Sequence, residues 1–380
     1  MRLKRFPLER PPVTTQLACF AIVILTLGCV ASDDPNRELT DKAALLSHGT
    51  LAPVELSGRQ LVADTMLGTP ARVRILSDSL LLVVDALPPF FHLINRGDGR
   101  LLSSFGRKGG GPGEFNSAVD IALVSGQGSR FWAYDVERKF MTLVDIDVAP
   151  GPDSRIIELR RIGYYHAPLF ADDSTLIVQS NSDSSAVAVY DLTSGDVQLI
   201  GKGMQFSPPS GLQMSPTASR QLNSEVRMCA GPRGRYARFH RLSGRFELLD
   251  SNGVVRAAKV PYAFEPTFEN SPDHGLTVYI GNRDQRASYG ECVATERYVF
   301  ALFAGRRWGS LSREEQNEFR NASFLHVFSW DGDYLAAAKF EEPIVGMDID
   351  TLTGQLYGVR FRPEPSLVLF DLAPLLVQLR

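Results

Sequence analysis

The sequence offers little from which a metal site or a nucleophile site could be built. Its 380 residues include only four cysteines, with no CxxC pair and no Cys/His spacing of the kind that binds zinc. The HExxH pattern of zinc proteases and the GxSxG elbow of α/β-hydrolases are also absent. No catalytic residue and no metal ligand can be assigned on this basis, so the sequence favours a protein without enzymatic activity.

The sequence also lacks a large excess of either positive or negative charge. The chain has 40 Lys and Arg against 43 Asp and Glu, a formal net charge of −3, which gives no general attraction to nucleic acid. Apolar residues make up 44% of the chain and exclude wholesale disorder. The length suits two ordinary domains or one large repeat architecture. We therefore expect folded structure and no nucleic-acid partner.

No apolar run is long enough to cross a membrane as a helix. The run Leu17–Leu27 spans eleven residues, whereas a spanning helix needs about 20. It follows a basic start that contains Arg2, Lys4 and Arg5. This arrangement is typical of a secretory signal, so we predict that the protein is exported.

The end of the signal contains a candidate lipidation site. Leu25–Cys29 (Leu-Thr-Leu-Gly-Cys) resembles a bacterial lipobox, with Thr26 where the pattern prefers Leu. We predict lipid attachment at Cys29; the alternative is cleavage after Ala31, which would release a soluble protein. Residues 1–28 are then the signal peptide, residues 29–50 a polar tether and residues 51–380 the folded domain. Removing residues 1–28 takes the formal net charge from −3 to −6, so any membrane attachment depends on the acyl chains.

Two cysteines remain outside the signal region. Cys229 and Cys292 would lie in a compartment where a disulfide can persist. They occur in different strand-like segments, and their separation in space does not follow from the sequence. We favour two independent buried cysteines, and a disulfide stays open.

One unit recurs along the rest of the chain, which has almost no long amphipathic helical pattern: an apolar strand, a turn and a second strand. Glycine supplies the positive φ that tight hairpins need. Four clear copies have these turn pairs: Asp98-Gly99, Ser194-Gly195, Asn252-Gly253 and Asp331-Gly332. Two looser copies begin at Phe140 and Leu367.

The spacing of the copies predicts the architecture. The turns are centred near residues 98, 150, 195, 253, 332 and 373, and a four-stranded propeller blade takes about 40–50 residues. Each hairpin would form the outer two strands of a blade, and the segment before it the inner two. We therefore predict an all-β, six-bladed β-propeller of four-stranded antiparallel blades. Residues 54–61 could complete the last blade and close the ring. A pair of β-sandwiches would explain neither the period nor the number of copies.

A family resemblance accompanies this pattern. Ser104–Asn116 (Ser-Phe-Gly-Arg-Lys-Gly-Gly-Gly-Pro-Gly-Glu-Phe-Asn), which runs into Ala118–Ala122, resembles the blade junction of NHL-type six-bladed propellers. With its signal, the chain is most similar to bacterial six-bladed, TolB-like propeller lipoproteins. The resemblance implies the fold and an exported, often lipidated location, but no common reaction. We expect a monomer in the periplasm or on the cell surface, attached to the membrane through Cys29, or a soluble secreted form if that residue is unmodified.

Long connections are expected on one face of the ring. In a propeller blade, the loops that join strand 4 to the next strand 1, and strand 2 to strand 3, emerge on the same side. The long segments 106–117, 201–222, 261–288 and 305–322 all fall into these two classes. Long loops at one mouth of a rigid scaffold are common ligand sites, and Arg and aromatic residues are typical anchors. The candidate binding residues are Arg107, Lys108, Glu114, Tyr164, Tyr165, His166, Tyr262, Phe264, Arg283, Arg286, Arg307 and Trp308. The alternative is that the aromatic residues plug the channel and the arginines are solvated.

Other patterns have simpler interpretations. Gly106–Gly113 resembles a phosphate cradle, but no Lys-Ser or Lys-Thr follows it, so a blade-joining turn is favoured. His92 and His326 occupy comparable places in the repeated hairpin, which indicates a scaffold role. Asp273-His274 is the best pair for acid/base work, although a solvated loop pair is the simpler interpretation. Residues 312–320 read as a short helix.

Three functions compete. We favour a non-catalytic binding module that holds an envelope protein, a peptide or a glycan, and it requires no cofactor. The alternative is a calcium-dependent lactonase or esterase, because some six-bladed propellers hold calcium with carboxylates and amides of the channel. Its candidate ligands would be Asp85, Asp120, Asp135, Asn223, Glu225 and Asp348. The segment Asp348–Gly354 also resembles a calcium loop, although an Asx-capped turn is favoured there. The third possibility is a structural component of the envelope.

Overall fold

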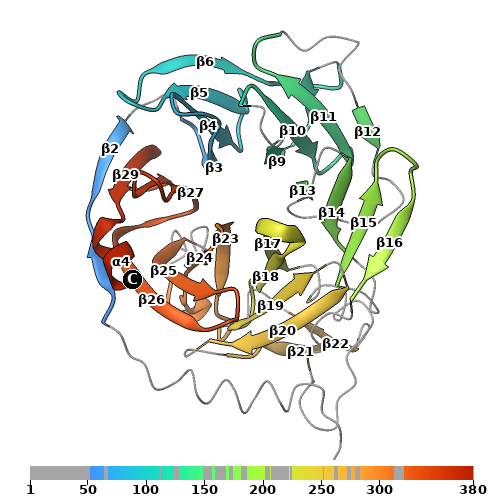
Figure 1. Ribbon diagram of the computed structural model, residues 1–380, viewed down its shortest axis with the longest axis vertical. Coiled ribbons are helices and arrows are strands. Elements are labelled where there is room, and N and C mark those ends of the chain that lie inside the picture. The colour runs from blue at the N-terminus through green and yellow to red at the C-terminus, as the bar shows by residue number, and fades with distance from the viewer. Residues whose placement is uncertain are drawn as a thin grey trace, which may run out of the picture. The chain divides into compact units, whose positions relative to one another are not determined.

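Six sheets are arranged as blades around a central axis, with their innermost strands facing it (Figure 1), and the region around this axis is called the channel. The computed structural model describes these residues: 52–63, 67–111, 113–117, 119–123, 128–148, 156–158, 168–170, 174–180, 186–201, 206, 222, 225–250, 252–260, 264–271, 275–278, 283–311 and 321–379. The predicted all-β, six-bladed propeller of four-stranded blades is confirmed. Cys29 and the predicted helix over 312–320 lie outside the described residues.

The strands of each blade follow one another in the chain, innermost first. Blade 1 consists of β3 (Pro70–Ile75), β4 (Leu80–Asp85), β5 (Phe91–Asn95) and β6 (Leu101–Phe105). Blade 2 consists of β9 (Val119–Leu123), β10 (Arg130–Asp135), β11 (Phe140–Asp145) and β12 (Ile156–Glu158). Blade 3 consists of β13 (Leu169–Phe170), β14 (Thr175–Gln179), β15 (Val187–Asp191) and β16 (Val197–Ile200). Blades 4 and 5 are β17 (Val226–Ala230), β18 (Tyr236–His240), β19 (Arg245–Asp250) and β20 (Gly253–Lys259); and β23 (Tyr289–Ala294), β24 (Tyr298–Phe303), β25 (Ala322–Ser329) and β26 (Tyr334–Ile344).

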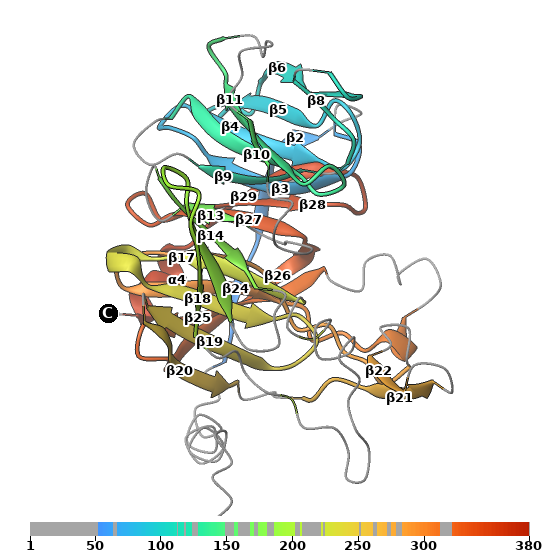
Figure 2. The ribbon, with the colours of Figure 1, turned by 90° about the vertical axis from the view of Figure 1, so that its right-hand side faces the viewer.

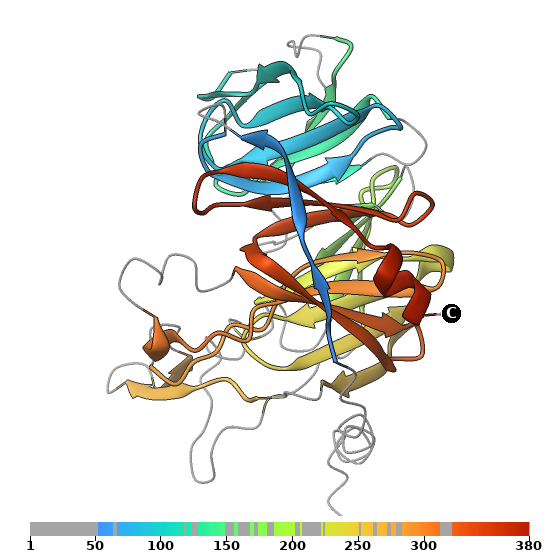
Figure 3. The same ribbon diagram turned by 90° about the vertical axis from the view of Figure 1, so that its left-hand side faces the viewer.

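Blade 6 closes the ring with strands from both ends of the chain. Its inner strands are β27 (Gly346–Asp350), β28 (Gln355–Arg360) and β29 (Ser366–Asp371), and its outermost strand is β2 (Gly58–Ala63), which pairs antiparallel with β29. Closure by the N-terminal segment is therefore confirmed from Gly58 onward. The residues before it differ from the prediction, because β1 (Val54–Leu56) pairs in parallel with β26 of blade 5. Figure 3 shows the blue segment crossing the outer edges of both blades.

A short polar turn ends the third strand of every blade. A side-chain oxygen of the last strand residue accepts a hydrogen bond from the backbone N–H two residues later, as in Asn95 to Gly97 at 2.9 Å and Asp191 to Thr193 at 2.7 Å. The same contact is made by Asp145, Asp250, Ser329 and Asp371. Asx and Ser/Thr turns of this kind favour a tight reversal. These turn residues are the reason why the hairpins could be predicted from the sequence.

The core lies between the blades rather than within one central mass. Each of six hydrophobic clusters joins neighbouring blades, and the cluster between blades 4 and 5 contains Phe239, Phe246, Tyr289 and Phe328. The alternation of a strand sends these side chains to one face of each sheet, where they pack against the next blade. This packing fixes the angular position of every blade and makes the scaffold rigid.

The two remaining cysteines form a disulfide, so the favoured interpretation of independent thiols was wrong. Cys229 on β17 and Cys292 on β23 have Cα atoms 5.7 Å apart and are bonded. The innermost strands of adjacent blades lie side by side at the channel (Figure 1). Residues 63 positions apart in the chain therefore meet. The bond links blade 4 to blade 5 directly.

Two of the long connections predicted to share one side of the ring do so, and most of the segment 201–222 lies outside the described residues. The connection from β6 to β9 contains β7 (Arg107–Lys108) and β8 (Glu114–Phe115), and the connection from β20 to β23 contains β21 (Phe268–Ser271) and β22 (Gly275–Val278). In Figure 2 both project to the same side, here called the loop-bearing face. The short helix α4 (Ala373–Gln378) lies on the other side (Figure 3). Among the described residues, no helix has the length and apolar character needed to cross a membrane.

Candidate functional site

The central channel is lined by paired charges. Arg72 of β3 contacts Asp120 of β9 through two nitrogens, Nε at 2.9 Å and Nη2 at 3.0 Å, and its Nη1 donates to Glu291 of β23 at 2.5 Å. Arg74 also pairs with Glu291. Burial opposes ionisation of Glu291, but Arg72 and Arg74 outweigh it and hold the pKa of this carboxyl below its ordinary value. These contacts tie blades 1, 2 and 5 together across the channel.

The carboxylates expected to hold calcium have separate structural roles. Asp120 pairs with Arg72, and Glu225 lies 3.4 Å from Arg241. Asp348 accepts backbone N–H groups of Ile75 at 2.8 Å and of Ile349 at 2.9 Å. Among the described residues, no group of three or more His, Cys, Asp or Glu side chains is placed to hold a metal ion. Asn223 lies outside the described residues.

Asp85 and Asp135 serve as matching anchors in blades 1 and 2. Each ends the second strand of its blade, and its carboxylate accepts backbone N–H groups of the segment that enters that blade. Asp85 accepts from Gly68 and Thr69, both at 2.7 Å, and Asp135 accepts from Asn116 at 2.7 Å. These two carboxylates therefore fix blade junctions and do not converge on a common ligand.

Two loops have the roles that the sequence favours. In the predicted Asx-capped turn, the Asp350 carboxylate accepts the backbone N–H groups of Leu352 at 2.9 Å and Thr353 at 3.2 Å, which confirms it. In the glycine-rich junction, the Glu114 carboxylate accepts the Gly111 N–H at 2.8 Å. The protein's own anion thus occupies this loop, which agrees with a blade-joining turn.

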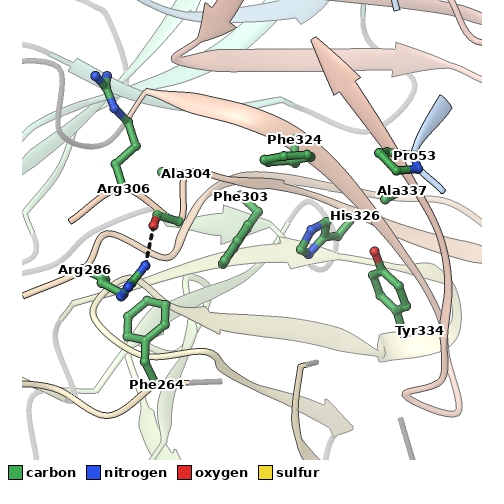
Figure 4. Close-up of a pocket in the computed structure, with 11 residues that line it drawn as sticks. Pro53, Phe264, Arg286, Phe303, Ala304, Arg306, Phe324, His326, Tyr334 and Ala337 are labelled. Carbon is green, nitrogen blue, oxygen red and sulfur yellow. Dashed lines mark hydrogen bonds between the residues drawn. The ribbon is translucent and has the colours of Figure 1, made fainter. Parts of the chain in front are cut away.

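A pocket lies against blade 5 and is also lined by the connection that enters it from blade 4 and by Pro53 (Figure 4); it is called the pocket between blades 4 and 5. It has a volume of about 610 Å³. Its described lining residues are Pro53, Phe264, Arg286, Phe303, Ala304, Gly305, Arg306, Phe324, His326, Tyr334 and Ala337. Four of these are Phe or Tyr, and none of the eleven is acidic.

Strand register explains the aromatic wall of the pocket. On β25, Phe324 and His326 are two residues apart and face the same side, and on β26 Ala337 lies directly opposite His326. Phe303, at the end of β24, lies opposite Phe324. The His326 and Phe303 rings are stacked with centroids 4.5 Å apart, and Tyr334 meets His326 edge-on at 5.2 Å. Three strands of blade 5 thus present one continuous aromatic surface.

His326 is neutral in this setting. Its side chain is buried, and its Nδ1 lies 3.1 Å from the hydroxyl oxygen of Tyr289. Burial lowers the pKa of His326 to about 3. The aromatic wall therefore carries no positive charge at neutral pH.

The opposite end of the pocket is cationic. Arg286 and Arg306 line it, and the Arg286 guanidinium donates to the Gly305 carbonyl at 3.3 Å. The buried Gln285 positions this segment, because its amide nitrogen donates to Leu242 O at 3.2 Å and its amide oxygen accepts the Thr267 N–H at 3.0 Å. The guanidinium of Arg286 is thus presented from a fixed backbone.

The structure brings together part of the predicted binding face. Phe264 and Arg286 line the pocket. The backbone segment around Arg283 pairs with the segment around Arg307 and Trp308, because the Trp308 N–H donates to Gln285 O at 2.8 Å and the Gly309 N–H to Arg283 O at 2.9 Å. Arg307 also pairs with Asp284.

The other predicted residues do not join this group. Arg107 and Lys108 on β7 and Glu114 on β8 belong to the connection between blades 1 and 2, away from the pocket lining. Four predicted residues lie outside the described part of the chain: Tyr164, Tyr165, His166 and Tyr262. The Asp273-His274 pair also lies there.

Sequence reasoning missed the inner wall. Phe303, Phe324 and Tyr334 were not singled out, and His326 was interpreted as scaffold, whereas it also lines the pocket. The alternation Phe324-x-His326-x-Phe328 was the available signal, since it predicts one aromatic face of a strand. This alternation could not indicate that part of the aromatic face lines a pocket instead of packing against blade 4.

Comparison with known proteins agrees with the fold. The sequence matches the family described as TolB-like 6-blade propeller-like over residues 58–351. The solved streptogramin B lyase has a TM-score of 0.51 at 10% identity, covering 83% of this chain and 98% of that one. A putative exported protein of Bacteroides fragilis has a TM-score of 0.49 at 14% identity, covering 83% and 94%. No curated protein matches the sequence significantly. At these identities the structural likeness shows the fold alone.

Proposed function

The chain belongs to the TolB-like 6-blade propeller-like family, and from this premise we propose that it is an exported, non-catalytic binding module of the cell envelope. Its ligand site is the pocket between blades 4 and 5. The observation that carries the proposal is the pocket itself, with about 610 Å³ of space, an aromatic wall and arginines at one end. Sites of about 300–1,000 Å³, mostly apolar with a few polar groups, are typical of ligand recognition.

The partner is an envelope protein, a peptide or a glycan that places one group in the pocket. A volume of about 610 Å³ has room for a side chain or a sugar unit of the partner, with the rest of the partner on the surrounding loops. The signal region and Cys29 support export and membrane attachment. A tether of residues 29–50 would connect the acyl chains to the propeller.

The calcium-dependent hydrolase has less support. It needs carboxylates that converge in the channel, whereas Asp85 and Asp135 anchor blade junctions and Asp120 pairs with Arg72. Arg72 and Arg74 in the channel would also repel a cation placed there. The binding module is therefore the better account of the described residues.

The proposal is tested by retention from an envelope extract. The mature chain is immobilised in three forms: wild type, Ala337→Phe and Leu352→Phe. Ala337 lies in the pocket wall, so a phenyl ring there fills the cavity, whereas Leu352 is 98% exposed on the turn between β27 and β28. Leu352→Phe therefore places the same aromatic side chain outside the site. Retained molecules are identified by mass spectrometry.

We expect a molecule that wild type and Leu352→Phe retain and Ala337→Phe does not. After prolonged incubation with the wild-type protein it should be recovered with its mass unchanged, because a binding module leaves its ligand intact. Equal retention by Ala337→Phe, or no retention specific to the open pocket, would overturn the assigned site. A changed mass would overturn the non-catalytic role.

A further inference from the structure

The chemistry of the pocket indicates which group it accepts. Resting on the proposed function, we infer that the pocket selects a flat apolar ring that bears an anionic group, such as an aromatic carboxylate. The anion would lie against Arg286 and the ring against the partly exposed Phe324 and Tyr334 side chains. Figure 4 shows Arg286 at one end of the lining and Tyr334 at the other, with Phe303 and His326 between them.

The charge distribution around the pocket favours an anion. The acidic neighbours of the lining segments are paired with other arginines: Glu265 with Arg245 and Asp284 with Arg307. No described lining residue is acidic, and the Arg286 side chain is exposed at the mouth. A guanidinium presents several N–H donors in one plane and matches a carboxylate or phosphate better than a neutral group.

The wall favours a flat ring. Phe303 and His326 are buried and stacked on each other, and the aromatic lining residues that stay partly exposed are Phe264, Phe324 and Tyr334. Such side chains pack well against another aromatic or planar apolar group. Aromatic pairs prefer offset-stacked or edge-to-face contacts, and both arrangements already occur within this wall.

The neutral imidazole fixes the direction in which the ligand lies. Because burial lowers the pKa of His326 to about 3, this ring offers no positive charge to an anion. The carboxylate is therefore expected at the Arg286 end, and the ring at the His326 end. The reverse orientation would bury an anion in the aromatic wall without a cationic partner, which is costly.

The experiment is calorimetric titration of the mature chain with three probes. Indole-3-propionate carries the ring and the anion, indole-3-propionamide carries the ring alone, and acetyl-Gly-Gly-Trp carries both at the end of a peptide. We expect the acid to bind about tenfold more tightly than the amide, since charge-assisted hydrogen bonds are roughly twice as strong as neutral ones. The peptide distinguishes the sources: tighter binding of the peptide identifies a chain end, and tighter binding of the free acid a small molecule.

Two variants locate the preference. Arg286→Gln should remove the tenfold difference by weakening the acid and leaving the amide unchanged. Arg297→Gln removes the same charge from an exposed residue between β23 and β24 that does not line the pocket, and should change neither affinity. Equal binding of acid and amide to the wild type, or binding of no probe, would overturn the inference. In that case retention of an envelope molecule that Ala337→Phe abolishes would still support the proposed function, so the two can fail separately.

Discussion

The central channel and the pocket between blades 4 and 5 are lined by side chains of different chemistry. In the channel, Arg72 and Arg74 are matched by Asp120 and Glu291, so the charges satisfy one another across the blades. In the pocket, the wall is aromatic and neutral, and the exposed Arg286 stands at one end with no acidic residue in the described lining. The channel therefore holds the ring together, whereas the pocket has chemistry left for a partner. The proposed ligand site is therefore displaced from the axis of the propeller.

The strongest test of this difference is the loss of one channel charge. Glu291→Gln keeps the size of the side chain but removes the carboxylate paired with Arg74 and leaves Arg72 with Asp120 alone. Removing one partner of a buried ion pair costs about 3–5 kcal/mol, so we expect the free energy of unfolding to fall by roughly 3 kcal/mol. Urea unfolding of the mature chain measures it.

The matched control is Glu55→Gln. Glu55 pairs with Lys339 at 3.1 Å, and both side chains are exposed. Exposed pairs contribute about 0–1 kcal/mol, so this variant should be nearly as stable as the wild type. A similarly small effect for Glu291→Gln would show that the channel network does not stabilise the ring.

The two regions also differ in how far the sequence predicts them. The blades were predictable because their signals are local: a glycine or Asx turn and an alternating strand need only neighbours in the chain, as at Asn95 and Asp191. The channel network and the disulfide could not be predicted in this way, because Arg72 and Glu291 are 219 residues apart and meet only when the ring closes. Phe264 and Arg286 were predicted from their loops, but the wall around His326 depends on the packing of blade 5 against blade 4.

The second test measures how the stability that comes from the buried His326 in the pocket wall depends on pH. In the unfolded chain His326 has an ordinary pKa near 6.5, and in the folded protein burial lowers it to about 3. Between these values the unfolded state binds a proton that the folded state does not, so this stabilisation is present above pH 6.5 and is lost as the pH falls. The expected loss from this residue is about 1.4 kcal/mol per pH unit.

The measurement is urea unfolding at pH 6.5, 5.5 and 4.5. His326→Phe should remove this part of the slope, so that the variant loses less stability than the wild type on acidification. Phe324→Leu disturbs the same wall but keeps the imidazole, and should retain the wild-type slope. Equal slopes for wild type and His326→Phe would show that the wall does not hold this residue neutral.

The smallest expected effect is that of calcium on stability. It tests whether the carboxylates of the channel region bind a ligand. If Asp85, Asp120 and Asp135 serve only as structural partners, calcium has no shared site among them, and the melting temperature of the mature chain should agree within about 1 °C in calcium and in chelator. A site filled at 100 times its Kd would add about 2.7 kcal/mol and shift melting by several degrees. Magnesium at equal ionic strength controls for screening. A shift specific to calcium, together with about one bound ion per chain, would place a ligand on the channel side as well, and the hydrolase would then be the function to test.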